Sequence, residues 1–105
     1  MLDDMTNLQS LLKDPSLLAT QGYLAGEWVD GEGGATFPVR NPARGDVVAN
    51  VADFTRAQTA DAIAKAEIAQ RFWAARTGKE RANILRRWYD LMMENADDLA
   101  TILTA

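Results

Sequence analysis

The side chains that carry out most enzyme chemistry are scarce in this sequence. Its 105 residues include no cysteine and no histidine. Nucleophilic catalysis by Cys-His or Ser-His pairs is therefore excluded, and so are the common transition-metal sites, which use these ligands. Ser10 and Ser16 lack any base that could activate them. We expect that nothing in the chain can run a reaction alone.

The acidic side chains are the remaining candidates for chemistry, but their positions favour structural roles. Two adjacent pairs lie at predicted helix starts, namely Asp3 and Asp4, and Asp97 and Asp98. The helix dipole explains acids at such places better than acid–base catalysis does. Asp30 and Glu32 border the glycine-rich stretch DGEGG, where two carboxylates are hard to hold in a fixed geometry. We predict no catalytic, cofactor-binding or metal-binding residue.

Small strands are predicted in the first half of the chain. Residues 22–29 read as a hairpin with the two-residue turn Ala25-Gly26, although alanine is a poor first residue for such a turn. Residues 36–39 and 47–51 read as two more strands, joined by a turn containing Asn41-Pro42 and Gly45. Residues 30–34 lack the spacing of a phosphate loop and are predicted to be a flexible surface turn.

A first long helix is predicted from Arg56 to about Arg76. Thr55 and Gln58 form a capping box at its start, in which side chains satisfy free backbone amides. Alanines line one face of this helix, which finishes in Trp73.

A second long helix is predicted to start with a capping box formed by Thr77 and Glu80. Its apolar residues recur every three or four positions and form one face: Ala82, Leu85, Trp88, Tyr89 and Met92, widened by Ile84, Leu91 and Met93. Arg86 and Asp90 lie one turn apart on the polar side. Asn95 is predicted to cap a third helix. Tyr23 in the hairpin and Tyr89 here lie on apolar faces and are predicted to be core residues.

These elements divide the chain into three parts. Residues 1–20 form a leader with a short helix at Thr6 to Leu12 that Pro15 stops, residues 21–54 hold the hairpin and strands, and residues 55–105 hold the helices. The segment is therefore predicted to be α+β. The pattern of the third helix is still running at Ala105, without a closing glycine, proline or basic turn. This favours a truncated helix, while a natural end stays open.

Composition narrows the classes of partner. The net charge is −4, and no apolar run reaches the roughly 20 residues of a membrane span. The start MLDDMTNLQS has no secretory or mitochondrial signature, and a chain without cysteine fits the cytoplasm, where we place it. Basic residues cluster between Arg71 and Arg87, but aromatic residues among them fall at core spacing. We therefore expect neither nucleic acid nor membrane as a partner.

In their order and spacing these pieces resemble one family, the aldehyde dehydrogenases. The matching segments are GYLAGEWV at residues 22–29, FPVRNPARGDVV at residues 37–48, the helix at residues 62–73, and the block from Lys79 to Ala100. The last block is most similar to the succinate-semialdehyde dehydrogenase branch. Ala25 and Gly78 depart from the usual asparagine and alanine.

The resemblance implies that the parent protein has a Rossmann-like α/β fold. It implies oxidation of succinate semialdehyde to succinate through a cysteine thioester, with hydride transfer to NAD or NADP. None of those roles maps onto a residue here, so we expect this segment to be inactive alone and to bind no cofactor. Its helices would lie on the cofactor-binding sheet. The implied partners are the remainder of the enzyme or a second copy, in a homo-oligomer.

Two other hypotheses compete with this one. The chain could be a free-standing α+β module that dimerises or binds a partner through its apolar helix faces. It could also be a helix pair that binds nucleic acid, which predicts salt-dependent DNA binding.

Overall fold

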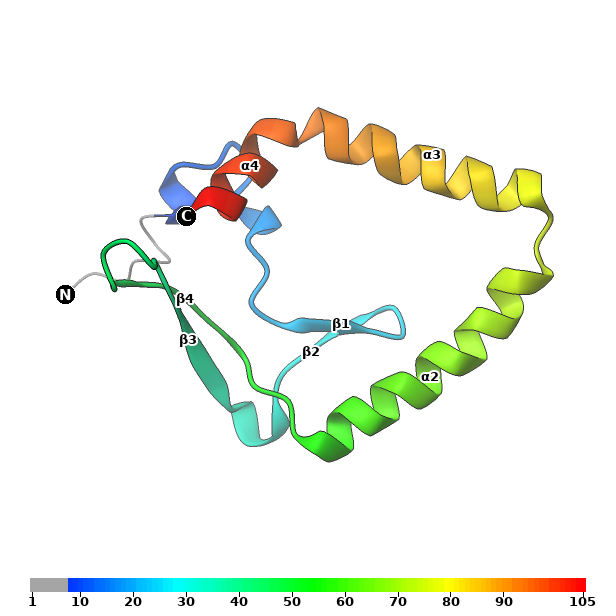
Figure 1. Ribbon diagram of the computed structural model, residues 1–105, viewed down its shortest axis with the longest axis horizontal. Helices are drawn as coiled ribbons and strands as arrows, with labels where there is room; N and C mark the ends of the chain where they lie inside the picture. The colour runs from blue at the N-terminus through cyan, green and yellow to red at the C-terminus, as the bar shows by residue number, and fades with distance from the viewer. Residues whose placement is uncertain (1–7) are drawn as a thin grey trace.

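The computed structural model describes residues 8–105, which form two small antiparallel sheets followed by three helices (Figure 1). Residues 8–10 are helical. The remaining elements are η1 Pro15–Leu17, β1 Gly22–Leu24, β2 Glu27–Val29, η2 Glu32–Gly34, β3 Thr36–Arg40, β4 Val47–Ala52, α2 Arg56–Ala75, α3 Gly78–Glu94 and α4 Ala96–Thr104. The predicted α+β order is confirmed.

These elements are arranged as an open ring. α2 and α3 form two sides, the strands form a third, and α4 meets the leader near the start of the described chain (Figure 1). The radius of gyration is 16.7 Å, whereas a compact domain of this length has a value of about 13 Å. Among the described residues only Leu8, Leu12 and Ala49 are buried apolar side chains. The helices do not close on the strands to form a common core.

The leader is only partly described. The predicted short helix is seen at residues 8–10, while Thr6 lies outside the described residues, as do Asp3 and Asp4. The helix ends well before Pro15, so the prediction that this proline stops it is wrong. Pro15 instead opens η1, because its fixed φ suits a first helical position. Asp14 caps η1 by accepting a hydrogen bond from the Ser16 amide at 3.1 Å.

The β1–β2 hairpin has the predicted two-residue turn. Tyr23 lies opposite Trp28, and their rings meet edge to face with centroids 4.9 Å apart. Both turn residues have positive φ, 50° at Ala25 and 82° at Gly26. The side chain of Tyr23 is exposed (61%), so its prediction as a core residue is wrong. The described part of the chain provides no surface that covers this ring.

Replacing Ala25 with asparagine is expected to stabilise the hairpin by about 1 kcal/mol, because alanine is strained at positive φ and asparagine tolerates it. Amide hydrogen exchange in β1 and β2 measures the change. The matched control is Ala43→Asn, in a turn without positive φ at that residue. Faster exchange in the Ala25→Asn variant would contradict the strain argument.

The β3–β4 hairpin also follows its prediction. β3 pairs with β4 with an irregularity between Val39 and Arg40, and the connecting turn ends at Gly45 with φ 81°. The carbonyl oxygen of the Asn41 side chain accepts from the amides of Ala43 at 2.8 Å and Arg44 at 3.2 Å. These local bonds explain why the Asn-Pro-x-x-Gly stretch reverses the chain here.

The stretch from Asp30 to Gly34 has a defined conformation, tied to the start of α2 by one side chain. The Gln58 oxygen Oε1 accepts from the amides of Thr55 at 3.1 Å and Glu32 at 3.0 Å, and Nε2 donates to the Asp30 carbonyl at 3.2 Å. The predicted capping box is confirmed. Gln58 also fixes the loop, which forms the short helix η2 where a flexible surface turn was predicted.

Candidate docking surface

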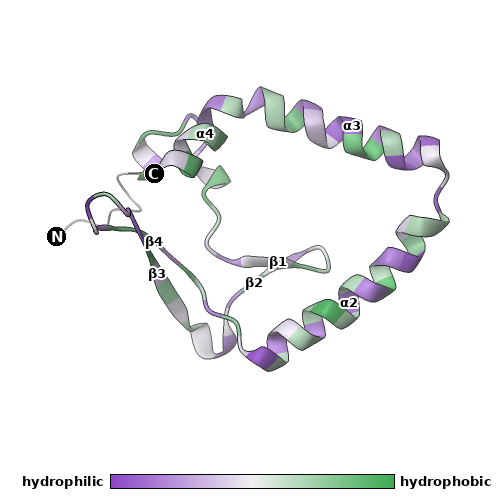
Figure 2. Ribbon diagram, in the orientation of Figure 1, coloured by the Kyte–Doolittle hydropathy of each residue, from purple (hydrophilic) through white to green (hydrophobic). Residues whose placement is uncertain are grey.

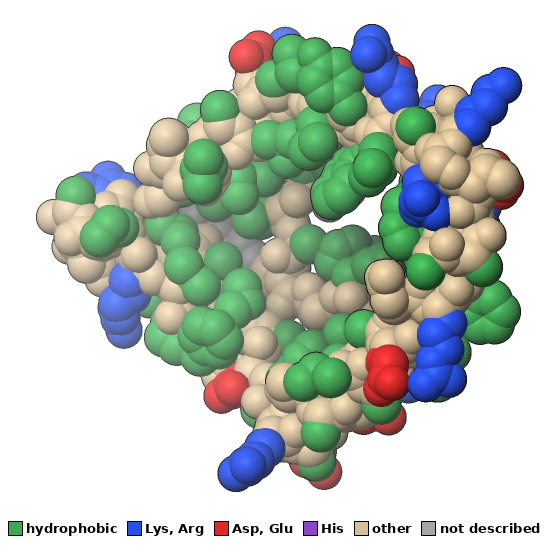
Figure 3. Space-filling model, turned by 45° about the vertical axis from the view of Figure 1, so that its right-hand side comes forward, with side chains coloured by type: hydrophobic (Ala, Val, Ile, Leu, Met, Phe, Trp, Pro, Cys, Tyr) green, Lys and Arg blue, Asp and Glu red, His purple; other side chains and the backbone are tan. Residues whose placement is uncertain are grey.

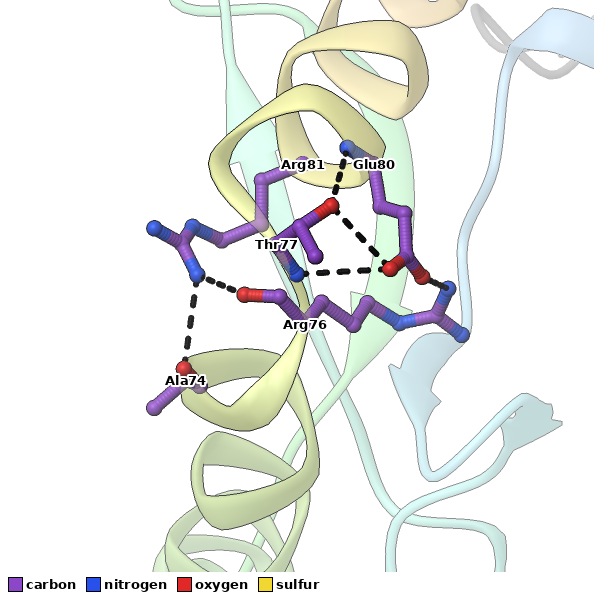
Figure 4. A network of polar contacts seen from close by, with 5 residues as sticks. All are labelled: Ala74, Arg76, Thr77, Glu80 and Arg81. Carbon is purple, nitrogen blue, oxygen red and sulfur yellow. Dashed lines mark hydrogen bonds and ion pairs between the residues drawn. The ribbon is translucent and has the colours of Figure 1, made fainter.

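The corner between α2 and α3 is fixed by polar contacts. The Thr77 hydroxyl accepts from the Glu80 amide at 3.1 Å, and the Glu80 carboxylate accepts from the Thr77 amide at 3.4 Å (Figure 4). Arg81 reaches back and donates to the carbonyl groups of Ala74 and Arg76 at the end of α2. The Arg76 guanidinium also forms an ion pair with the Glu80 carboxylate, with Nη1 and Oε2 3.7 Å apart. The capping box that was predicted is confirmed, and it holds two helices that diverge from the corner (Figure 1).

The apolar face of α3 is exposed along its length. Trp88 is 61% exposed and Tyr89 is 47% exposed, and the same face carries other exposed residues: Ile84, Leu85, Leu91, Met92 and Met93. Apolar side chains gather around the hollow of the ring in Figure 3. The hydropathy colouring of Figure 2 alternates between hydrophobic and hydrophilic residues along α2 and α3. A surface this apolar and extensive marks an interaction site.

The prediction of Tyr89 as a core residue is wrong for the described chain. Its side chain is about half exposed, and the Arg86 guanidinium of the same helix lies 5.1 Å from the ring centroid. Arg86 also pairs with Asp90 at 3.3 Å, as predicted. The residue pattern correctly identified the apolar face, but the surface that would cover it is not supplied by residues 8–105.

The start of α4 differs from the prediction. Asn95 precedes the helix but makes no capping bond with its side chain, which instead donates to the Leu91 carbonyl at 2.9 Å. Asn95 therefore occupies the predicted N-cap position, but it makes no side-chain capping bond, because the end of α3 competes for the same side chain. Asp97 and Asp98 lie in the first turn of α4, where negative charge is favoured.

Asp98 joins α4 to the leader, which sequence reasoning missed. Its two carboxylate oxygens accept from the backbone amides of Lys13 and Asp14, each at 2.9 Å, and the residue is 6% exposed. These two bonds lower the pKa of Asp98, and the charge of Lys13 acts in the same direction, while desolvation opposes them. The carboxylate closes the ring between segments that are far apart in the sequence.

The hydrogen bonds that join the Asp98 carboxylate to the leader are expected to weaken at low pH. Because the pKa is lower in the folded state, the contact stabilises the protein above the ordinary carboxyl pKa of 3.8, and this contribution is lost as the pH falls through the folded-state value. In Asp98→Asn the leader should be loosened already at neutral pH, since the amide has one acceptor oxygen. Methyl chemical shifts of Leu8 and Leu12 report the release. If Asp97→Asn has the same effect as Asp98→Asn, the assignment is wrong.

The described residues form no constellation for catalysis. The Asp30 carboxylate accepts a hydrogen bond from the Gln21 side chain at 2.9 Å. The Ser16 hydroxyl donates to the Asp14 carboxylate at 2.6 Å. Asp30 and Ser16 are thus both engaged in local hydrogen bonds. A cavity of about 240 Å³ between the leader, the β3–β4 turn and α4 holds the ion pair of Arg44 and Asp46, 3.1 Å apart. It pairs no nucleophile with a base. Within residues 8–105 no three acidic side chains gather to bind a metal ion.

The structure is an α+β segment whose two longest helices, α2 and α3, have exposed apolar side chains. The model of the aldehyde dehydrogenase family matches residues 28–105. The chain belongs to the aldehyde dehydrogenase family. In the part that the structure describes, no helix is long and apolar enough to cross a bilayer.

Named relatives agree with this family. The chain is 50% identical over 93 residues to the glutarate-semialdehyde dehydrogenase of Pseudomonas aeruginosa, covering 89% of this chain and 19% of the relative. It is 44% identical over 93 residues to an NADP-dependent succinate-semialdehyde dehydrogenase of Escherichia coli, covering 89% and 19%. The crystal structure of succinate-semialdehyde dehydrogenase from Burkholderia pseudomallei matches with a TM-score of 0.82 and 50% identity, covering 89% and 19%. The chain thus spans about a fifth of the length of these relatives.

Proposed function

We propose that this chain is the N-terminal portion of an NAD(P)-dependent semialdehyde dehydrogenase, and that its role there is structural. The complete enzyme would oxidise succinate semialdehyde to succinate. The identity to the Pseudomonas aeruginosa relative makes glutarate semialdehyde the second candidate substrate. Both aldehydes carry a carboxylate at the far end of a short carbon chain. Following the sequence prediction, we propose a cytoplasmic homo-oligomer.

The exposed apolar face of α3 is the observation that carries this proposal. Large apolar side chains gain roughly 1.5–3 kcal/mol each when they are fully buried. In the described chain Leu85, Trp88 and Met93 are at least half exposed, so most of that free energy is still to be gained. Because the family's proteins are about five times longer than the matched stretch, the remaining polypeptide is the natural source of a covering surface.

We propose that the described residues do not hold the dinucleotide. The glycine-rich stretch at residues 31–34 leads through η2 into strand β3, so it does not present a helix N-terminus to a phosphate group. In the cavity lined by Arg44 and Asp46, the arginine is already paired with the Asp46 carboxylate at 3.1 Å, which leaves no unpaired positive charge there for a phosphate group. We therefore propose that the nicotinamide cofactor is held by the remaining polypeptide, which would also supply the reactive thiol.

Reassembly from two pieces tests the proposal. The second piece is the Pseudomonas aeruginosa relative without the stretch that this chain matches, called the truncated relative below. Each piece alone should lack activity, and co-expression of both should restore NAD(P)-dependent oxidation of succinate or glutarate semialdehyde. The proposal fails if the chain oxidises either aldehyde alone, or if co-expressed pieces neither associate nor react. Association of this chain only with itself would support the free-standing module.

A further inference from the structure

The shape of the ring depends on its corners, because α2 and α3 are not packed on a common core. Among residues 8–105 the buried apolar side chains are those of Leu8, Leu12 and Ala49, and none of these lies in α2 or α3. The two helices diverge from the corner that joins them (Figure 1). The angle between them therefore depends on the corners of the ring, above all on the one that they share.

The backbone alone leaves the end of α2 incompletely bonded. Arg76 and Thr77 link the two helices, and both have extended backbone, with φ −70° and ψ 152° at Arg76 and φ −65° and ψ 158° at Thr77. α2 thus ends without the left-handed residue that commonly closes a helix by satisfying its last carbonyl groups. The Arg76 amide reaches the Trp73 carbonyl at 3.1 Å, but within the described chain no backbone amide reaches the carbonyl of Ala74.

The side chain of Arg81 supplies the missing donor. Its Nη1 nitrogen donates to the Ala74 carbonyl at 3.3 Å and also to the Arg76 carbonyl (Figure 4). In the part of the chain that the structure describes, Arg81 is the one side chain of α3 that bonds a residue inside α2. A residue of α3 thus acts as the C-terminal cap of α2, where the helix dipole favours a positive charge.

Arg81 is also the least exposed position of α3. Every other residue of Gly78–Glu94 is exposed, including those of the apolar face, whereas Arg81 is half-buried. In an amphipathic helix the charged side chains normally face water and the apolar ones are enclosed. The reversed order in α3 indicates that the Arg81 side chain has a structural task at the corner.

We propose that Arg81 is a latch that fixes the angle between α2 and α3. Its two bonds join the first turn of α3 to the end of α2, whereas Glu80 bonds only Thr77 and Arg76 in the link between the helices. At one fixed angle, the exposed apolar side chains of both helices are presented to a docking partner in a preformed arrangement. Preformed surfaces bind more tightly because less freedom is lost on association. The docking step rests on the proposed function, but the latch itself does not.

Double electron–electron resonance on the free chain tests the latch. The natural chain has no cysteine, so spin labels can be attached at Ala60→Cys in α2 and Arg87→Cys in α3, which are both exposed positions. With Arg81 in place we expect one narrow distribution of distances between the labels. Arg81→Met keeps a long apolar side chain but has no donor, and should broaden the distribution at least twofold. Circular dichroism should show that the helix content is unchanged.

Arg86→Met is the matched control for this measurement. It removes an arginine of the same helix whose ion pair, with Asp90, stays within α3. The distribution in this variant should be as narrow as in the chain with Arg86. The latch is overturned if the distribution is already broad with Arg81 in place, if Arg81→Met leaves it narrow, or if Arg86→Met broadens it equally. A loss of helix in Arg81→Met would overturn it too, because Arg81 would then support folding rather than orientation.

Binding to the truncated relative tests whether the latch serves docking. Without spin labels, Arg81→Met should bind about tenfold more weakly than the natural chain, because only a fraction of the molecules has the competent angle. Arg86→Met should bind as the natural chain does. Equal Kd values for Arg81→Met and the natural chain would overturn the docking role. If the natural chain itself does not bind, the proposed function fails, while the distance measurement still decides the latch.

Discussion

Replacing Trp88 with alanine is expected to leave the free chain folded as it is and to weaken its binding to the truncated relative by about 3–5 kcal/mol, a hundredfold or more in Kd. The indole is 61% exposed in the chain, so its removal disturbs little there. In the reassembled enzyme it would be buried, and its loss would leave a cavity. Circular dichroism reports on the free chain, and titration with the truncated relative gives the Kd.

Arg87→Ala is the matched control for this experiment. Arg87 is the next residue of α3, is exposed, and lies outside the apolar stripe. It should change the Kd by less than tenfold, as surface substitutions usually do. The docking surface would be misassigned if Trp88→Ala and Arg87→Ala bind equally well, or if Trp88→Ala unfolds the free chain.

Replacing Gly31 with alanine is expected to disrupt the junction between the two small sheets. A Cβ atom at this position would lie 2.3 Å from the Asp53 carbonyl oxygen and 2.5 Å from that of Ala35. Both are backbone atoms, so no side-chain rotation relieves the collision. The Asp53 amide donates to the Ala35 carbonyl at 2.8 Å, and this bond would be strained. The cost should be about 1–3 kcal/mol, seen as faster hydrogen exchange of the Asp53 amide.

Replacing Gly78 with alanine is expected to stabilise the protein, whereas the same replacement at Gly31 destabilises it. Nothing lies within 4 Å of a Cβ atom at Gly78, and its φ is not positive. Because Gly78 begins α3, alanine should stabilise the helix by up to about 1 kcal/mol. Equal exchange rates in the Gly31→Ala variant and the natural chain would show that the junction can adapt and that the tight contact is unimportant.

Local features of this fold could be predicted from the sequence because their causes lie within a few residues. The capping boxes of Thr55 and Thr77 each need a partner only three positions away. The turn at Ala25-Gly26 and the strands around Gly45 depend on similarly short patterns. For the same reason the apolar faces of the helices were identified correctly.

Features that depend on distant partners could not be predicted. Asp98 was interpreted through the helix dipole alone, because its bonds to Lys13 and Asp14 span more than 80 residues. The Asn95 side chain could either cap α4 or bond to the end of α3, and in the structure it donates to the Leu91 carbonyl of α3. The exposure of Tyr23 and Tyr89 depends on what the chain packs against, which a periodic pattern does not specify. The periodic pattern alone predicted an apolar face on α3, and the expectation that this face needs cover from outside the segment came from the family resemblance.

The central claim is that α3 docks on the remaining polypeptide of a semialdehyde dehydrogenase, and hydroxyl-radical footprinting measures this directly. Side-chain oxidation of Trp88, Met92 and Met93 would be compared in the chain alone and in the chain co-purified with the truncated relative. We expect all three side chains to be oxidised readily in the free chain and strongly protected in the complex. Unchanged oxidation of the three in an active complex would show that this face does not dock there, and would contradict the account.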